Sequence, residues 1–194
     1  MRLTDTPEIM EPSFYITPPS ALGTFGIVWR KTGDGPRVHR VFLPDKKALA
    51  EDLIHLGFSV ASNMSCPAIN KLGSRIQMFL EGRDIIFDMD MLALDGCSQF
   101  QRKVLLAEYK IPRGMVSAYG RISKRLNLPG GARAVGSALS HNPFPIIVPC
   151  HRTIRYDGQP GGFQGGPEMK RALLELEEIK FSRSGKVITD RLYY

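Results

Sequence analysis

The sequence predicts an α+β fold in which a small α/β domain, residues 1–95, precedes a mostly helical domain, residues 96–194. Runs typical of strands concentrate in the first half, whereas apolar residues at helical spacing dominate the second. The length of 194 residues suits two small domains or one large one. The net charge also differs: the first domain has 10 Lys/Arg against 12 Asp/Glu, and the second has 16 Lys/Arg against 7 Asp/Glu. Residues 91–97 are the expected link between the two domains.

In the first half the sequence predicts three short strands, at residues 26–29, 38–43 and 84–89. A glycine-containing turn at residues 32–36 separates the first two. Two helices are expected, one at residues 45–56 with Asp45 as its N-cap and one at 70–80 that ends near Gly82. Residue types that carry out catalysis do not gather in this half, so we interpret it as a scaffold.

The second half predicts a helix over residues 98–109, which ends before Pro112 because proline cannot continue a helix. Two shorter helices, at residues 118–126 and 131–139, flank a Pro/Gly turn. This arrangement is a helix-turn-helix pattern, which many small helical hairpins share. A further helix is expected to start at Pro167, because proline is favoured in the first turn.

Basic and small side chains mark the two helices around that turn. The first carries Arg121, and the second carries Arg133 beside Ala132 and Gly136. Small residues let a backbone approach the surface of a nucleic-acid groove, and the positive second half favours an anionic partner. A helix pair packed inside the protein would explain the small residues nearly as well, and a solvated basic face would explain the charge.

Residues 149–152, Pro-Cys-His-Arg, place a thiol beside an imidazole at the end of an apolar stretch, residues 142–149, that contains three prolines. A cysteine is a strong nucleophile only as the thiolate, and a neighbouring histidine or arginine helps it to ionise. The prolines exclude a helix, so we expect Cys150 to be held at a fixed depth. A buried structural cysteine is the plainer interpretation of these four residues alone.

Two features later in the sequence could form a site together with Cys150. Residues 156–166 contain five glycines and suit a pocket wall in which Phe163 forms a flat face. Glu177 lies four residues after Leu173 on the next helix and therefore shares its apolar stripe. A buried acid needs a partner, for which a histidine is suited, whereas an exposed glutamate with slight drift of the helical face would fit the pattern equally.

Composition narrows the classes of protein. Hydrophobic residues make up 43% and charged residues 23%, which is ordinary for a soluble globular chain. No apolar run approaches the roughly 18 residues that span a bilayer and the start lacks a signal-peptide core, so no membrane partner is expected. The three cysteines favour a reducing interior, and we expect a cytoplasmic protein that is a monomer. Cys66 and Cys97 show neither a paired framework nor metal-ligand spacing, and no metal or cofactor is expected.

Several motifs occur together in a fixed order across residues 100–181. They are 133–136 (Arg-Ala-Val-Gly), 142–143 (Asn-Pro), 147–152 (Ile-Val-Pro-Cys-His-Arg), 165–166 (Gly-Gly), and Leu173, Leu174 and Glu177. In this the chain resembles the O6-alkylguanine-DNA alkyltransferases, or methylated-DNA–protein-cysteine methyltransferases. The resemblance implies a winged helix-turn-helix-like motif in the second domain and, more loosely, a ribonuclease-H-like first domain.

The resemblance also implies a reaction: one direct transfer of an alkyl group from O6-alkylguanine, or O4-alkylthymine, in double-stranded DNA to Cys150, after the nucleotide is flipped. His151 would activate the thiol through a water, Glu177 would orient His151, and Asn142 would brace the turn around the site. Tyr119 would crowd the 3′ phosphate and lend a proton to the guanine. The thioether product has no visible route to cleavage, so each molecule should act once.

DNA and base contacts are implied in the same way. Arg133 matches the finger that fills the space left by the extruded nucleotide, with Tyr119, Arg121, Ala132 and Gly136 as further DNA contacts. The implied substrate pocket includes residues at which the chain departs from the commonest family pattern, which are Thr153 in place of valine, Phe163 in place of tyrosine and Gln164 in place of a small hydroxylated residue. Glu178 replaces a glycine at the helix end, with no evident effect on chemistry.

Three rival functions are weaker. Alkyltransferase-like lesion sensors typically carry tryptophan at the acceptor position, which here is Cys150. A transcription regulator would leave the Gly-rich loop and the Cys150, His151 and Glu177 set unexplained. A Cys-His hydrolase lacks a visible oxyanion-hole signature and would make no use of the basic half.

Overall fold

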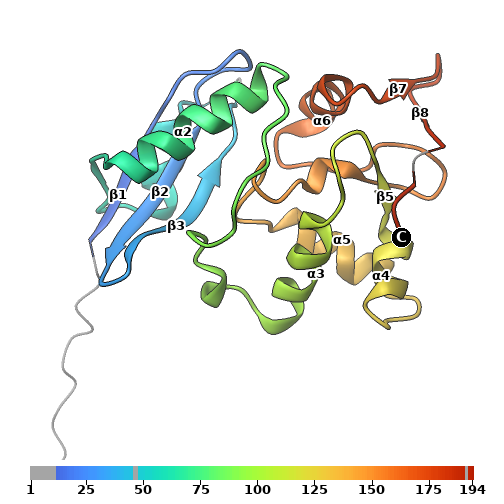
Figure 1. Cartoon of the computed structure of the whole chain (residues 1–194), viewed down its shortest axis with the longest axis horizontal. Coiled ribbons are helices and arrows are strands. Elements are labelled where there is room, and N and C mark those ends of the chain that lie inside the picture. Colours follow the sequence, from blue (N-terminus) through green and yellow to red (C-terminus); the bar gives the residue numbers. More distant parts are fainter. Residues whose placement is uncertain (1–11, 46–47, 191) are drawn as a thin grey trace, which may run out of the picture.

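The computed structural model describes residues 12–45, 48–190 and 192–194. Figure 1 shows a sheet with its helices in one lobe and a mostly helical second lobe beside it. The mixed α+β architecture predicted from the sequence is confirmed. No helix in the described part of the chain is long and apolar enough to cross a membrane. All three cysteines are free thiols.

The N-terminal sheet has the strand order β3-β2-β1-β4. Its strands are β1 (Ser13–Ile16), β2 (Gly26–Thr32), β3 (Gly35–Phe42) and β4 (Ser62–Asn63). The first three pair antiparallel, whereas β4 runs parallel to β1. The predicted strands at 26–29 and 38–43 are confirmed as β2 and β3, which the turn between them joins. The sequence prediction missed β1.

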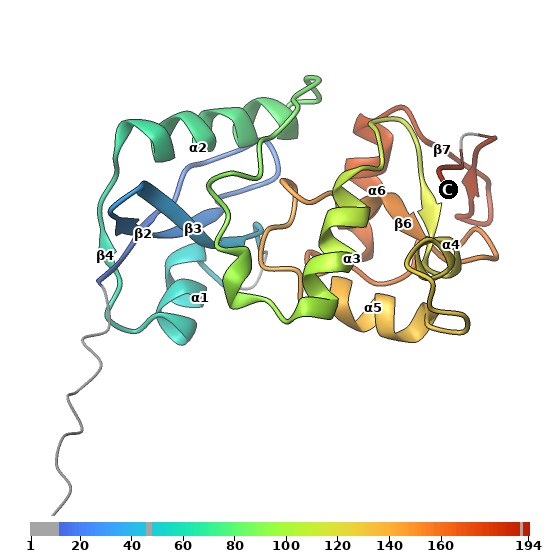
Figure 2. The ribbon, with the colours of Figure 1, turned by 60° about the horizontal axis from the view of Figure 1, so that its bottom comes forward.

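Helices α1 (Ala50–Gly57) and α2 (Pro67–Leu80) cover opposite faces of this sheet (Figure 2). Successive side chains of β2 point to opposite faces of the sheet, which explains this arrangement. Val28 packs in the same hydrophobic cluster as Ile54 of α1, whereas Ile27 and Trp29 pack in the cluster that contains the buried residues of α2.

The predicted boundaries of these two helices need correction. Asp45 is not an N-cap, since α1 begins at Ala50 after an extended Leu49; residues 46–47 of the predicted helix lie outside the described residues. The helix begins there because Ala50 and Ile54 are the residues that it buries. Helix α2 begins three residues earlier than predicted, with Pro67 in its first turn, a position where the missing N–H costs nothing.

The strand predicted at residues 84–89 is wrong. This segment is irregular and pairs with no strand among the described residues, because Ile86 is exposed to solvent and only Phe87 is buried, against Phe79. The chain instead reaches the sheet at the predicted link, where Val38 donates to the carbonyl of Met91 (2.7 Å) and accepts from Ala93 (2.8 Å).

The second lobe follows the predicted helices closely. Helix α3 (Gln99–Tyr109) begins after Ser98, whose hydroxyl accepts from the N–H of Gln101 at 3.2 Å. The remaining elements are α4 (Tyr119–Arg125), α5 (Ala132–Ser140), the short 3-10 turn η2 (Cys150–Arg152) and α6 (Gly166–Leu176). Two parallel residue pairs join β5 (Ser117–Ala118) to β6 (Thr153–Ile154), and a hairpin joins β7 (Lys180–Phe181) to β8 (Val187–Ile188).

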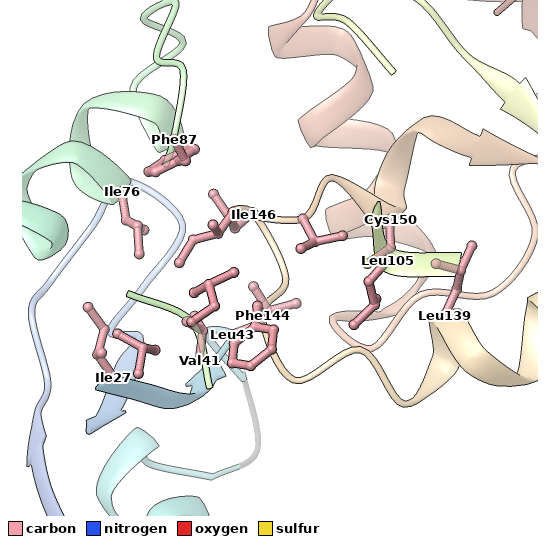
Figure 3. Close-up of a cluster of buried hydrophobic side chains, with 14 of the residues drawn as sticks. Ile27, Val41, Leu43, Ile76, Phe87, Leu105, Leu139, Phe144, Ile146 and Cys150 are labelled. Atoms are coloured by element: carbon pink, nitrogen blue, oxygen red, sulfur yellow. The ribbon is translucent and has the colours of Figure 1, made fainter. Parts of the chain in front are cut away.

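One buried cluster runs through both lobes. In Figure 3, Phe144 lies between Val41 of β3 on one side and Leu105 and Cys150 on the other, and Ile146 lies near Leu43 in the same cluster. The N–H of Val41 also donates to the carbonyl of Pro143 at 2.8 Å. The segment that leads to Cys150 is therefore part of the packing between the lobes. The predicted division at residues 95/96 falls inside η1 (Leu94–Gly96) and stays a prediction.

Glu178 follows the C-terminal end of α6 and has a strained backbone conformation. The N–H of Ile179 donates to the carbonyl of Leu174 (3.0 Å) and that of Glu178 to Glu175 (3.0 Å), the paired bonds of a Schellman motif. Glu178 holds the left-handed position with φ 66°, where a side chain costs about 1 kcal/mol and glycine costs little.

We therefore expect Glu178→Gly to stabilise the protein by about 1 kcal/mol, measured by urea unfolding. Glu178→Gln is the matched control, since it removes the carboxylate from the helix C-terminus but keeps the left-handed side chain, and should gain only a few tenths of a kcal/mol. An equal gain in both variants would mean that charge, not backbone conformation, is the cause.

Candidate active site

The segment before Cys150 holds it at a fixed depth. The N–H of Val148 donates to the carbonyl of Phe144 and that of Cys150 to Val148, both at 2.8 Å. Between them Ile146 has φ 74°, a conformation that a β-branched residue rarely adopts and that the surrounding packing must maintain. Cys150 begins η2 and is 5% exposed.

Asn142 braces this turn from its centre. Its Nδ2 donates to the carbonyl of Val148 (3.1 Å) and to Sγ of Cys150 (3.2 Å), while its Oδ1 accepts from the N–H of Phe144 (2.9 Å). The side chain is fully buried. Asn142 therefore holds both the backbone of the turn and the sulfur atom through hydrogen bonds.

His151 and Glu177 meet inside the protein. Nε2 of His151 lies 2.9 Å from Oε1 of Glu177, and since a carboxylate only accepts, Nε2 carries the proton. Nδ1 of His151 is buried and has no hydrogen-bond partner among the described residues. Arg152 also holds Glu177, with Nη2 to Oε1 at 2.7 Å and Nε to Oε2 at 2.9 Å. The rings of Phe79, from the first lobe, and His151 lie 5.9 Å apart.

Burial and these contacts set the charges. Burial alone would raise the pKa of Glu177, but His151 and Arg152 outweigh it and lower that pKa to about 2. Burial lowers the pKa of His151 although Glu177 opposes the change, so the imidazole is neutral. Burial raises the pKa of the Cys150 thiol to about 12, against the hydrogen bond from Asn142. The resting thiol therefore needs a base before it can attack.

Cys150 opens into a cavity of about 410 Å³. A second hollow of about 380 Å³ shares Tyr119 and Gly136 with it and includes Ala132 and Arg133. The cavity that contains the thiol is lined by Tyr119, Gly136, Leu139, Ser140, Cys150, Gly162, Phe163 and Gln164. Residues from α4, α5 and the Gly-rich loop thus surround one reactive sulfur.

The chain is similar to known proteins in both sequence and fold. Residues 99–179 match the family model described as 6-O-methylguanine DNA methyltransferase, DNA binding domain. A methylated-DNA–protein-cysteine methyltransferase of Methanothermobacter thermautotrophicus is 45% identical over 125 residues, which cover 63% of this chain and 70% of that protein. The chain belongs to the methylated-DNA–protein-cysteine methyltransferases.

Other relatives agree with this assignment. The Mycobacterium tuberculosis H37Rv methyltransferase is 45% identical over 106 residues, 55% of this chain and 63% of that protein. The crystal structure of Mycobacterium tuberculosis OGT in complex with DNA is similar with a TM-score of 0.68 and 31% identity, covering 85% of this chain and 92% of that one. The methyltransferase structure from Pyrococcus kodakaraensis covers 86% and 99%, with a TM-score of 0.65 and 28% identity.

Within this methyltransferase the structure brings most of the predicted site residues together. Gln164 is exposed, but its amide donates to the carbonyl of Asn142 at 2.6 Å and so joins the loop to the bracing turn. Thr153 is fully buried and does not line the cavity. Arg133 and Arg121 are both exposed, and Arg121 donates to the carbonyl of Tyr194.

Sequence reasoning missed three buried charged residues around the cysteine of this methyltransferase. Arg152 was named in the motif without a role, yet it binds Glu177. Glu108 and Lys170 are both fully buried. Glu108 follows Val104 by four residues on α3, so the stripe argument applied to Glu177 could have found it. The described residues contain no cluster of three or more side chains suited to a metal ion.

Proposed function

We propose that the protein repairs DNA by one transfer of an alkyl group from O6-alkylguanine, or O4-alkylthymine, in duplex DNA to Cys150, and is not regenerated. The observation that supports this best is a cysteine sulfur that lines a cavity of about 410 Å³ while the adjacent His151 is oriented by a buried carboxylate. The DNA-bound relative with the same fold supports duplex DNA as the partner.

Proton transfer starts at the thiol. Glu177 keeps the proton of His151 on Nε2, which leaves the lone pair of Nδ1 free to accept one. A water between Sγ of Cys150 and Nδ1 would carry the proton, and the imidazolium formed would be stabilised by the carboxylate of Glu177.

The alkyl transfer itself is a displacement at carbon. A bond forms between the alkyl carbon and Sγ of Cys150, the bond from that carbon to O6 breaks, and its electron pair leaves with the guanine. Tyr119, which lines the cavity, donates a proton to the leaving base and is reprotonated by the proton taken from the thiol. The product is a thioether, and no group in the site can cleave it, so one molecule acts once.

Burial of the sulfur requires that the nucleotide leaves the stack. With Cys150 only 5% exposed, a base inside a duplex cannot reach it, and flipping costs a few kcal/mol. Arg133 lies in the hollow that adjoins the cavity through Tyr119 and Gly136, which suits a finger that fills the vacated space. The helix-turn-helix role of α4 and α5, and the ribonuclease-H-like description of the sheet with order β3-β2-β1-β4, belong to this proposal.

Arg133→Ala should slow repair in duplex DNA by about 10- to 100-fold and leave the reaction with free O6-benzylguanine nearly unchanged, because the free base needs no flipping. Single-turnover rates on both substrates measure this. Lys31→Ala removes the same charge from β2 and should change neither rate. Equal losses on the two substrates would remove Arg133 from the flipping step.

The proposed function is tested by incubating the protein with duplex DNA that carries a labelled O6-methylguanine and then measuring intact and peptide masses. A gain of one methyl group on Cys150 is expected. A lesion sensor would bind this DNA without gaining mass, and a transcription regulator would show no preference for it.

A further inference from the structure

Two fully buried charged residues that the proposed chemistry does not use meet at Thr153. The hydroxyl of Thr153 donates to Oε2 of Glu108, on α3, at 2.5 Å. The carbonyl of the same residue accepts from Nζ of Lys170, on α6, at 2.6 Å. Thr153 follows η2 directly, so both charges are tied to the turn that carries Cys150.

Lys170 also reaches the cavity wall. Its Nζ donates to the carbonyl of Gly162 at 3.2 Å, and Gly162 lines the cavity together with Cys150. Both hydrogen bonds of Lys170 to the described residues thus go to neutral carbonyl oxygens. Burial lowers the pKa of Lys170 to about 8, while the charges of Cys150 and Glu108 act in the opposite direction.

The buried carboxyl group of Glu108 has fewer hydrogen bonds than its two oxygen atoms could accept. Its Oε1 is buried with no hydrogen-bond partner in the part of the chain that the structure describes. Burial raises the pKa of Glu108 to about 7, opposed by Thr153, Lys170 and Arg152. A carboxyl group in this position changes its charge close to neutral pH, beside a cysteine that must ionise.

We propose that Lys170 and Glu108 are opposed positioning charges for Cys150: the ammonium of Lys170 stabilises the thiolate, and the carboxylate of Glu108, once ionised, opposes it. The inference rests on the proposed function in taking Cys150 as the acceptor. Other titratable or charged groups act on Cys150 or Glu108 from the neighbouring elements, and they are Tyr119 on α4, Arg152 on η2, and Tyr194. His151 adjoins Cys150 in the sequence and faces Glu177.

Removing each of the two charges should have opposite effects on ionisation of the Cys150 thiol. Removing the positive charge of Lys170 makes the thiolate harder to form, whereas removing the negative charge of Glu108 makes it easier. A purely structural role for the pair would instead change the rate of Cys150 alkylation in the same direction in both variants. Glu108→Gln keeps an oxygen that accepts from Thr153, so it changes charge with little change in shape.

The experiment compares the rates at which iodoacetamide alkylates Cys150 of the full chain at about pH 7.5, with peptide mass to locate the label. At this pH Lys170, whose pKa is about 8, is mostly protonated and Glu108, whose pKa is about 7, is mostly ionised, so both charges are present. Glu108→Gln should speed alkylation by about 10-fold, and Lys170→Met should slow it by about 10-fold. The controls Glu175→Gln and Arg171→Met make the same charge changes in an exposed ion pair on α6 and should leave the rate unchanged.

Rate changes in the same direction, or no change, would overturn the inference. Circular dichroism checks that each variant is folded. If Lys170→Met does not fold, an unchanged or lowered rate in Glu108→Gln alone overturns the inference. The probe needs no DNA, so a wild-type protein that takes no methyl group from DNA would refute the proposed function and leave this test of the two charges intact.

Discussion

We expect Cys150→Ser to abolish alkyl transfer, with a loss of at least about 10³-fold, while the variant still binds DNA that contains O6-methylguanine. The sulfur lies in a cavity where burial already raises the pKa of the thiol to about 12, and a serine hydroxyl in the same place is far harder to ionise. Single-turnover transfer and DNA binding, measured on the same preparation, test this.

The matched control is Cys66→Ser, which removes a partly exposed thiol at the start of α2 in the first lobe. It should transfer like the wild type. Loss of transfer in the control, or transfer retained in Cys150→Ser, would show that Cys150 is not the acceptor.

Glu177→Gln should slow transfer by about 100-fold and move the rise of the rate to higher pH. The carboxylate of Glu177 raises the pKa of His151 against the effect of burial, so its loss leaves a weaker base for the Cys150 thiol. DNA binding should persist, because Glu177 is 1% exposed and cannot contact DNA. An unchanged pH profile would remove Glu177 from thiol activation.

The same substitution should cost about 3 kcal/mol of stability, since it leaves Arg152 buried without its carboxylate. The folded pKa of Glu177, about 2, lies below its ordinary 4.5, so this contribution is complete above about pH 4.5 and is lost as pH falls through about 2. Glu175→Gln, in the exposed pair with Arg171, should change urea stability by less than about 0.5 kcal/mol.

Local patterns in the sequence predicted the helices and the buried acid well. Helix α3 has a cap, an apolar stripe and a stop within its own residues, and Glu177 could be placed because its stripe lies on the same helix. The predicted strand at 84–89 failed because strands need a partner, and the sequence does not show that Val38 pairs with Leu92 instead.

Contacts between distant residues could not be predicted in this way. Arg152 and Glu177 are 25 residues apart, and Thr153 and Glu108 are 45 apart, so only the fold brings them together. Similarly, β1 is four residues long and forms only through pairing with β2 and β4. The left-handed backbone conformation of Glu178 could not be predicted either, because glutamate disfavours it and only the way in which α6 ends imposes it.

The central claim, a single alkyl transfer to Cys150, is tested most directly by counting products. Excess duplex DNA with a labelled O6-methylguanine is mixed with a known amount of protein, and labelled protein and repaired guanine are followed with time. We predict one burst in which both equal the active protein present, with the label on Cys150 and no further turnover. Repaired guanine that continues to accumulate beyond one equivalent, or label elsewhere on the chain, would contradict it.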